Sequence, residues 1–350
     1  MPLLRGNFLA AIKRHSVVAD LRPFLTFAAM DKLTSYLEQF EEFLAKESFD
    51  PKYKNLYDPV DYTLSNAGKR LRPLVVMMAC EAYSGQTQTA LPAAKAIELF
   101  HNFTLLHDDV MDDAPLRRGK DSVYRKFGLN SAILSGDVML ILSYDCIKDY
   151  DPPLYKWIMQ VINENAIKVC EGQQLDIDFE TREDVSIQEY LLMIELKTAV
   201  LFGGALKIGA LIGGASKEQS QHLYEFGKNV GIAFQMQDDI LDTYGDNPKV
   251  GKQKGGDILQ CKKTYLYLKT MDLLEGEEKM SFQSLYDSDE QNKVSKVIEV
   301  FDRVVIKEYT EQVKQAYLDL AWSHLDACGL HENQKALFVD FGNFLLKREY

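Results

Sequence analysis

The chain has 350 residues, of which 46% are hydrophobic and 26% are charged, and its formal net charge at pH 7 is −12. Such a composition indicates a folded protein with ample core, and the acidic balance excludes a nucleic-acid binder that relies on a basic footprint. An anionic substrate is not excluded, because bound metal ions can invert the local field. The five cysteines are scattered and lack CxxC spacing, which favours reduced thiols in a cytosolic (cytoplasmic) protein. No apolar run reaches the ~18 residues typical of a membrane span.

Residues 1–29 differ from the rest of the chain, because they contain four basic residues and a single acid, Asp20. A basic, acid-poor start is typical of an organelle transit segment, but such segments are usually rich in serine, and this one is not. We therefore expect an N-terminal extension, with Met30 as a possible true start, followed by one domain over residues 30–350.

Helical periodicity dominates the remaining sequence. Apolar residues recur at helix spacing over residues 33–44, 91–111, 131–147, 155–179, 187–212, 218–243, 292–327 and 333–347. A further helix is expected after residues 68–73, and Pro152-Pro153 marks a break. Convincing hairpin signals and linker-like tracts are absent, and residues 244–257 form a long Gly/Lys loop. The sequence therefore predicts an all-α, single-domain protein of roughly ten or more helices.

Two Asp-Asp-x-x-Asp motifs lie within these helical segments, at residues 108–112 and 238–242. In each motif the first and last Asp are four residues apart, so they share one helical face. Like charges on one face repel one another unless a cation neutralises them, and oxygen-only ligands suit Mg²⁺. A solvated acidic face remains the alternative for either motif alone. Apolar neighbours weaken that alternative for the second motif, where Gln235 extends the polar stripe.

Basic segments accompany both motifs. Gly68-Lys69-Arg70-Leu71-Arg72-Pro73 precedes a helix, whose N-terminus itself favours anions. Arg117-Arg118-Gly119 follows the first Asp motif, and Lys197-Thr198 and Gly172-Gln173-Gln174-Leu175-Asp176 lie on later helices. Lys252, Lys254 and Lys262-Lys263 follow the second motif. Metal ions combined with Arg and Lys side chains are suited to binding two diphosphates.

Taken together, these motifs resemble the trans-isoprenyl diphosphate synthases, the family of farnesyl and geranylgeranyl diphosphate synthases. The resemblance is dense from residue 61 to residue 263 and rests on six ordered motifs. It implies an all-α bundle around a deep central cavity (the isoprenoid synthase fold) and a homodimer. One departure from the family pattern is Ala67, which stands where the family usually has the first Gly of Gly-Gly-Lys-Arg.

The resemblance also implies a role for each matched residue. The Mg²⁺ ligands, for three ions, would be Asp108, Asp109, Asp112 and Asp238, with Asp239 and Asp242 binding metal directly or through water. The allylic diphosphate would be held by Arg117, Lys197 and Lys252. Isopentenyl diphosphate would be bound by Gly68, Lys69, Arg72, His101 and Arg118, with Lys262 as a further substrate contact. Thr198 and Gln235 would stabilise a carbocation, and Gln173 and Asp176 would support the allylic and metal side.

Some of these residues have simpler interpretations that stay open. A single Lys or Arg is most often a solvated surface charge, and His101 lies on an apolar stretch where a core histidine is common. Asp113, directly after the first motif, is interpreted as surface charge.

Product length would depend on side chains that precede the first Asp motif. An ideal helical wheel places Thr104 below Asp108 and Phe103 well off that face, so the assignment of Phe103 as the floor rests on the resemblance. Phe100 and Phe103 can equally be ordinary core. We expect a short-chain product and leave C15 and C20 both open.

The implied reaction is the Mg²⁺-dependent head-to-tail condensation of isopentenyl diphosphate with an allylic diphosphate (dimethylallyl, geranyl or farnesyl). The departed diphosphate would accept the final proton. Two alternatives compete. A class I terpene cyclase normally replaces the second Asp motif with a mixed Asn/Ser/Glu motif, and a non-catalytic subunit of a heteromeric prenyltransferase has no reason to retain every charged residue of the site.

Overall fold

The computed structural model describes residues 27–46, 48–66, 68–245 and 254–346, and these are helical almost throughout. The all-α prediction is confirmed. Most of the expected extension, together with Ala67 and Lys252, lies outside the described residues. No described helix is long and apolar enough to cross a membrane.

The chain divides into two compact units. The first contains the described residues up to Val161, with 205–220 and 330–341. Its elements are α3 (Phe27–Leu44), η1 (Pro51–Tyr53), α4 (Lys54–Ser65), α5 (Leu71–Ser84), η2 (Gln88–Ala90), α6 (Leu91–Met111), β1 (Leu116–Arg117), β2 (Lys120–Asp121), α7 (Val123–Phe127) and α8 (Leu129–Asp145). Helix α6 has the bounds expected from the sequence.

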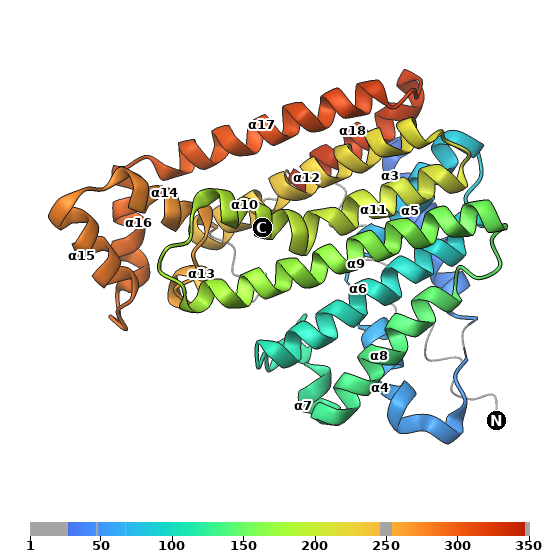
Figure 1. Ribbon diagram of the computed structural model, residues 1–350, viewed down its shortest axis with the longest axis horizontal. Helices are drawn as coiled ribbons and strands as arrows, with labels where there is room; N and C mark the ends of the chain where they lie inside the picture. Colours follow the sequence, from blue (N-terminus) through green and yellow to red (C-terminus); the bar gives the residue numbers. More distant parts are fainter. Residues whose placement is uncertain (1–26, 47, 67, 246–253, 347–350) are drawn as a thin grey trace. The chain divides into compact units, whose positions relative to one another are not determined.

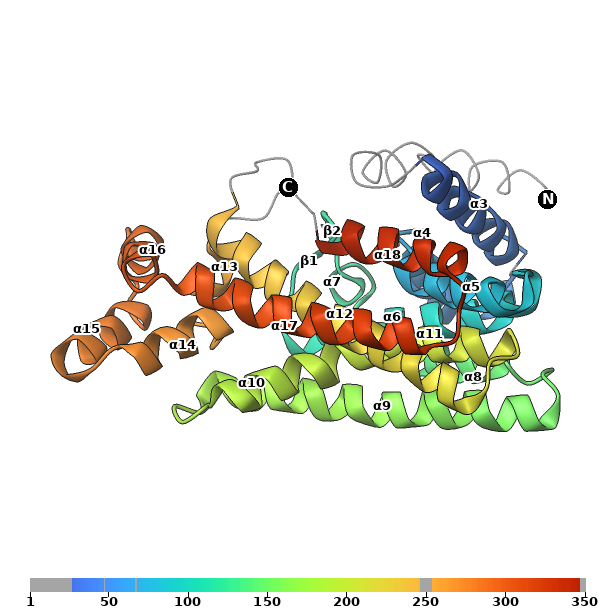
Figure 2. The ribbon, with the colours of Figure 1, turned by 90° about the horizontal axis from the view of Figure 1, so that it is seen from above.

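Close helix approaches build the first unit. Helices α6 and α8 lie side by side (Figures 1 and 2), and a Cβ at Gly136 on α8 would come within 2.2 Å of His107 Nε2 on α6. Helix α11 (Val200–Ile212) meets α5 through Gly209, where an added Cβ would lie 2.1 Å from the Val76 carbonyl oxygen. Glycine is required at Gly209, because a side chain there would press on the backbone of α5, whereas at Gly136 the His107 ring would have to move.

A two-residue hairpin, β1 and β2, follows the first Asp motif, although the sequence showed no convincing hairpin signal. Leu116 pairs with Asp121 and Arg117 pairs with Lys120. The turn residues Arg118 and Gly119 both have positive φ, 54° and 73°. Tight hairpin turns need this backbone, but usually with Asn-Gly or Asp-Gly, so the Arg-Gly turn escaped sequence analysis.

The second unit contains residues 162–204, 221–329 and the described residues from 342. Helices α9 (Pro152–Thr181), α11, α12 (Lys217–Tyr244) and α18 (Glu332–Leu346) contribute residues to both units. The other elements of the second unit are α10 (Ile187–Ile194), η3 (Glu195–Ala199), α13 (Gly256–Leu259), α14 (Tyr265–Leu273), α15 (Gly276–Tyr286), α16 (Lys293–Arg303) and α17 (Ile306–Ala327).

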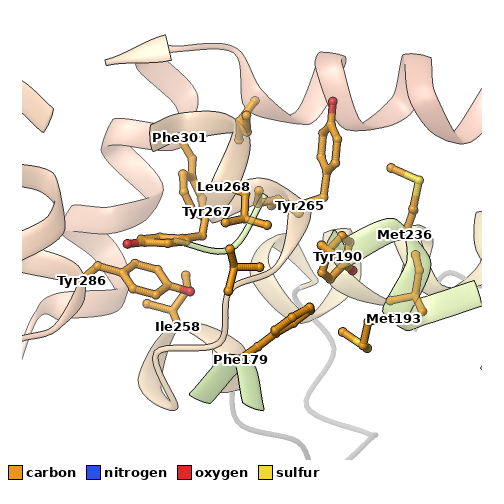
Figure 3. Close-up of a cluster of buried hydrophobic side chains, with 14 of the residues drawn as sticks. Phe179, Tyr190, Met193, Met236, Ile258, Tyr265, Tyr267, Leu268, Tyr286 and Phe301 are labelled. Carbon is orange, nitrogen blue, oxygen red and sulfur yellow. The ribbon is translucent and has the colours of Figure 1, made fainter. Parts of the chain in front are cut away.

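An aromatic core holds the C-terminal helices of the second unit together. Tyr267, Phe282 and Tyr286 stack on one another, and Phe301 packs against Phe282. Figure 3 shows Tyr267, Tyr286 and Phe301 in one cluster with Ile258 of α13. The cluster joins α13, α14, α15 and α16, so the segment after the second Asp motif is anchored by apolar burial.

The structure changes two predicted helical stretches. Residues 292–327 form two helices, because Val305 has a left-handed backbone with φ of 52° and ends the helical run. Residues 187–212 are helical throughout, as expected, but they contain a π-helical turn, η3, between α10 and α11. Such turns are rare and often mark functional sites, and this one carries Lys197 and Thr198.

Candidate active site

The first Asp motif ends α6 in the first unit. Asp108 is half-buried, Asp109 is buried and Asp112, the last residue of the motif, is exposed at the helix end. Arg117 of β1 bridges the first two acids: its Nε lies 2.7 Å from Asp109 Oδ1, and its Nη2 lies 3.3 Å from Asp108 Oδ2. The hairpin therefore places a guanidinium directly against the motif.

Burial and neighbouring charge act in opposite directions on this pair. Burial raises the pKa of Asp109 above its usual value, although the hydrogen bond from Arg117 lowers it. The pKa of Arg117 is raised, because its bond to Asp109 and the charges of the motif outweigh its burial. Asp109 is therefore an acid that needs a cation beside it to remain charged.

Arg72 and His101 form the second contact of the first unit. Arg72 Nη1 lies 3.0 Å from His101 Nε2. Burial, followed by the charges of four arginines, holds the pKa of His101 well below its usual range, so its ring is neutral and accepts the hydrogen bond. Burial also lowers the pKa of Arg72 to about 10. Its Nε is buried without a hydrogen-bond partner among the described residues, which leaves a donor for an anion.

Gly68 and Arg118 bring the loop before α5 against the hairpin. A Cβ at Gly68 would lie 3.1 Å from Arg118 Cζ, and Arg118 Nη1 donates to the Asn66 carbonyl oxygen at 3.1 Å. Lys69 is half-buried in the same loop. Of the five residues expected to bind isopentenyl diphosphate, the structure therefore brings together Gly68 with Arg118 and Arg72 with His101.

Sequence analysis missed the buried group that anchors this loop, Arg70. It has a left-handed backbone with φ of 53°, and its guanidinium makes three contacts: Glu98 Oε1 at 2.6 Å, Glu41 Oε1 at 2.8 Å and the Leu64 carbonyl oxygen at 2.6 Å. Asn102 Nδ2 also donates to Glu98 Oε1, at 2.9 Å. Glu98 is thus the buried counter-charge that ties α6 to the basic loop. An acid in an apolar helical run was the available signal.

A small pocket lies under the hairpin, lined in part by Asn66, Asn102, Asp109, Arg117, Arg118 and Ser122. The side-chain oxygens Asn102 Oδ1 and Ser122 Oγ are buried there without partners among the described residues. Buried polar atoms of this kind are commonly satisfied by ordered water.

The second Asp motif lies on α12 in the second unit. Asp239 is buried, and the hydroxyl of Tyr190 on α10 donates to its Oδ2. Burial raises the pKa of Asp239 well above its usual value, the charges of Asp257 and Asp238 act in the same direction, and Tyr190 and Gln235 lower it by hydrogen bonding. The expected polar stripe of Gln235 and the acids is thus partly confirmed by contact, and Tyr190 is a partner that the sequence did not reveal.

Asp242, the last acid of this motif, is bonded to the start of α13. Its Oδ2 accepts a hydrogen bond from the Asp257 amide at 2.9 Å, and its carbonyl oxygen accepts one from the Gly255 amide at 2.7 Å. Asp242 therefore also orders the chain that returns from the Gly/Lys loop. The expected allylic contact Lys252 lies outside the described residues.

The π-helical turn and α9 form a close pair. A Cβ at Gly172 would lie 2.3 Å from the Lys197 backbone nitrogen, so only glycine permits this approach. At this contact Lys197 Nζ donates to Asp176 Oδ2 at 2.6 Å. Thr198 is half-buried in the same turn, and Gln173 Nε2 is buried without a partner among the described residues. The Gly-Gln-x-x-Asp segment thus meets Lys197 through its glycine and its acid.

The remaining expected residues have plain surroundings. Lys262 is exposed, and its carbonyl oxygen accepts a hydrogen bond from Tyr286. Phe103 stacks edge-on with Phe100 at 5.7 Å and with His107 at 4.8 Å. Thr104 donates to the His101 carbonyl oxygen of its own helix. Their roles in substrate binding and product length stay predictions.

The side chains at both motifs are of the kind that Mg²⁺ binds. Each motif supplies carboxylate oxygens, and burial disfavours the charged form of one carboxylate in each. Among the described residues no three acids, histidines or cysteines converge as a ready-made metal cluster. Mg²⁺ does not require one, since it usually binds through one or two carboxylates plus substrate phosphates and water. The first motif lies in the first unit and the second motif in the second, so their facing one another stays a prediction.

Each of the two Asp-rich helix segments has one buried acid, which is Asp109 beside Arg117 in the first unit and Asp239 beside Tyr190 in the second. The polyprenyl synthetase family model matches residues 53–304. A short chain isoprenyl diphosphate synthase of Methanothermobacter thermautotrophicus is 34% identical over 92% of this chain and 99% of its own. A geranylgeranyl diphosphate synthase of Methanosarcina mazei is 36% identical over 85% and 91%.

A crystal structure of a geranylgeranyl pyrophosphate synthase, 40% identical, superimposes with a TM-score of 0.85 over 92% of this chain and 99% of that one. The chain belongs to the polyprenyl synthetase family of prenyltransferases.

Replacing Glu98 with Gln should lower the free energy of unfolding by about 3 kcal/mol, because the buried Arg70 guanidinium loses one of its two carboxylate partners. Denaturant unfolding monitored by circular dichroism measures the change. Asp145→Asn, at the exposed Lys148 ion pair, is the matched control and should leave unfolding unchanged. Equal effects of the two substitutions would contradict the anchoring role of Glu98.

Replacing Gly172 with Ala should destabilise the protein by about 1–3 kcal/mol, because the new methyl group overlaps the Lys197 backbone. The same unfolding measurement applies. Glu171→Ala, at the exposed neighbouring position, provides the control. A Gly172→Ala protein as stable as the control would show that α9 and the π-helical turn are not in tight contact.

Proposed function

We propose that this prenyltransferase condenses isopentenyl diphosphate head-to-tail with an allylic diphosphate in a Mg²⁺-dependent reaction. The observation that carries the proposal is the pairing of buried motif acids with basic side chains in the first unit: Arg117 bridges Asp108 and Asp109, and an anion-ready Arg72 lies in the same unit. The similarity to isoprenyl diphosphate synthases over nearly the whole chain supports it.

The allylic diphosphate is assigned to the acids of the two motifs, with Arg117, Lys197 and Lys252. Asp108, Asp109, Asp112 and Asp238 would hold Mg²⁺, three ions in all, and Asp239 and Asp242 would assist. Bound Mg²⁺ supplies charge neutralisation for the diphosphate as the allylic C–O bond breaks. Arg117 already lies beside two of these acids, so the same guanidinium can contact a diphosphate held at the motif.

Isopentenyl diphosphate is assigned to the loop before α5 and the hairpin turn. Gly68, Lys69, Arg72, His101 and Arg118 would surround its phosphates. His101 is neutral and accepts from Arg72, so it orients that guanidinium without adding charge of its own. The unsatisfied Arg72 Nε and the lowered pKa of Arg72 both favour a bound anion.

The cationic intermediate would be stabilised by oxygen dipoles in the second unit. Thr198 lies on the π-helical turn and Gln235 one turn before Asp239, and both are half-buried. Asp176 would fix Lys197 through the hydrogen bond at 2.6 Å, and Gln173 would support the same allylic and metal side. No described side chain is assigned as a general base, so the departing diphosphate takes the proton from the condensed product.

Two other functions are weaker. A class I terpene cyclase would need neither the Gly-Lys-Arg-x-Arg-Pro segment nor a second Asp motif. Here Arg70 is buried in an ion pair with Glu98, and half-buried Arg72 contacts His101. A non-catalytic subunit would gain nothing from burying Asp239 against Tyr190, which costs stability unless the charge is used.

For the product we propose the C20 diphosphate, because two of the similar proteins are named geranylgeranyl diphosphate (or pyrophosphate) synthases. Phe103, with Phe100 and Thr104 as neighbours on α6, is assigned to limit the length of the chain. All five cysteines are thiols outside disulfides, which supports a cytosolic location.

We also propose a homodimer. One face of α8 exposes the large apolar side chains of Leu129, Ile133, Leu134 and Ile141, which recur at helix spacing. Contiguous apolar surface of this kind usually marks an interface, and a second copy of the same chain is the occupant that closed symmetry favours.

The first test is condensation by the purified protein with labelled isopentenyl diphosphate and dimethylallyl, geranyl or farnesyl diphosphate. We expect a Mg²⁺-dependent C20 product, read by chromatography, that chelation abolishes. Asp108→Asn should lower the turnover by at least about 100-fold without unfolding the protein. Asp113→Asn, the adjacent acid outside the motif, is the control and should retain activity. No condensation with any primer would refute the proposed reaction.

Replacing Ile141 with Glu should convert a dimer into a monomer, because a charge would enter an apolar interface. Light scattering measures the mass directly against the 39.9 kDa of one chain. Met280→Glu is the control, since Met280 on α15 is equally exposed at 64% but lies outside the α8 face. A wild-type protein that is monomeric would contradict the homodimer.

A further inference from the structure

A cysteine and a buried lysine meet just after α13, outside the residues assigned to catalysis. Lys293 Nζ donates to Cys261 Sγ at 3.0 Å, and the Cys261 thiol donates to the Tyr286 carbonyl oxygen at 3.3 Å. Cys261 lies in the segment between α13 and α14, and Lys293 is the first residue of α16. Both therefore belong to the second unit.

The lysine is the unusual member of the pair. Only 3% of Lys293 is exposed, and among the described residues its ammonium has no carboxylate partner. Within the described residues its one hydrogen bond is to the Cys261 sulfur, and its Nζ lies 5.5 Å from the centroid of the Tyr286 ring. A buried ammonium is costly without an anion beside it. The Lys293 ammonium is therefore placed to stabilise negative charge that develops on the Cys261 sulfur during a reaction.

The backbone at Cys261 gives a second reason to look for a role of the side chain. Its φ is 53°, in the left-handed region where glycine is favoured and a Cβ is disfavoured. A cysteine at this position has the Cβ that glycine would lack, and it places a thiol between the Lys293 ammonium and the Tyr286 carbonyl oxygen. The nearby titratable groups are Tyr267 and Tyr286, both neutral phenols with raised pKa values, and the acids Asp257 and Asp287.

Another cysteine supplies an internal comparison. Cys170 on α9 is exposed, but burial of its thiol and the charge of Glu171 raise its pKa. No lysine contact stabilises its thiolate among the described residues. The reactivity of a cysteine depends on its thiolate form more than on exposure alone. We therefore expect Cys261, the less exposed of the two, to be the more reactive.

We propose that Cys261 and Lys293 form a peroxide-reactive thiolate–ammonium pair, a site of reversible oxidation next to the second Asp motif. The thiolate sulfur attacks one oxygen of hydrogen peroxide, an S–O bond forms and the O–O bond breaks. Sulfur is oxidised to the sulfenate, and the other peroxide oxygen is reduced and leaves as water. The sulfenate keeps the negative charge and remains bound to the Lys293 ammonium.

The site has a direct route to the proposed chemistry. Helix α13 ends two residues before Cys261, and the amide of its residue Asp257 donates to Asp242 of the second motif. The Lys262 carbonyl oxygen, directly after Cys261, accepts from the Tyr286 hydroxyl at 2.6 Å. An added oxygen on Cys261 has to displace one of these contacts, because the thiol already lies at hydrogen-bonding distance from two groups.

Labelling of the whole protein tests the modification without reference to catalysis. The reduced chain is treated with hydrogen peroxide and a cyclic 1,3-dione that traps sulfenic acid, and labelling of each cysteine is followed by mass spectrometry. We expect Cys261 to be labelled at least about tenfold faster than Cys170, since the Lys293 ammonium contacts the Cys261 sulfur and no described lysine contacts that of Cys170. Equal or slower labelling of Cys261 would overturn the proposal.

Two substitutions of Lys293 separate charge from packing. Lys293→Met removes the cation and should slow labelling of Cys261 about tenfold while leaving Cys170 unchanged. Lys293→Arg keeps the cation and should restore most of the rate. Thermal unfolding checks that both variants are folded. Labelling of Cys261 that is independent of the charge at position 293 would refute the pairing.

Cys261→Gly is the matched variant for the functional consequence. Its thermal unfolding is recorded first, because glycine suits the left-handed backbone but leaves the Lys293 ammonium without its sulfur contact. After peroxide treatment the wild type should lose condensation activity, and reductant should restore it, whereas Cys261→Gly should keep its activity. Equal losses in the two proteins would show that Cys261 is not the sensitive site. The labelling result stands even if the condensation reaction itself is refuted.

Discussion

The compensation of buried charge is the constraint on which both halves of the candidate site depend. In the first unit Glu98 is buried against Arg70, and this pair fixes the backbone from which the neighbouring basic residues project. Arg117 likewise supplies the compensating positive charge beside Asp108 and Asp109. Charges removed from water are stable only when each has a partner with good geometry. The site is therefore a network in which moving one charge disturbs several others.

In the second unit the acids are stabilised by a phenol, a lysine and backbone amides. Tyr190 donates to Asp239, Lys197 donates to Asp176, and the Asp257 amide donates to Asp242. Each of these partners comes from a different element, so the acids of α12 and α9 also hold the surrounding helices in place. The acids that we propose for the reaction therefore also serve the fold.

Unusual backbone conformations occur where elements come close to the candidate site residues. The π-helical turn interrupts an otherwise regular helix at Lys197, and Gly172 lets α9 approach it. Positive φ angles at Arg70, Arg118 and Cys261 occur where the chain turns beside a charged group. Such conformations are costly for residues with a Cβ and persist only where the surrounding contacts fix them. These positions are therefore the most informative ones in the structure.

The sequence by itself determined the helical class, the bounds of α6 and both Asp motifs with their basic neighbours, because helical period and residue type are local properties. Only the tertiary structure decided that Arg70 faces Glu98, that Tyr190 meets Asp239 and that Cys261 meets Lys293. These partners lie 28, 49 and 32 residues apart. Contacts at such separations depend on how helices pack, and no local pattern encodes them.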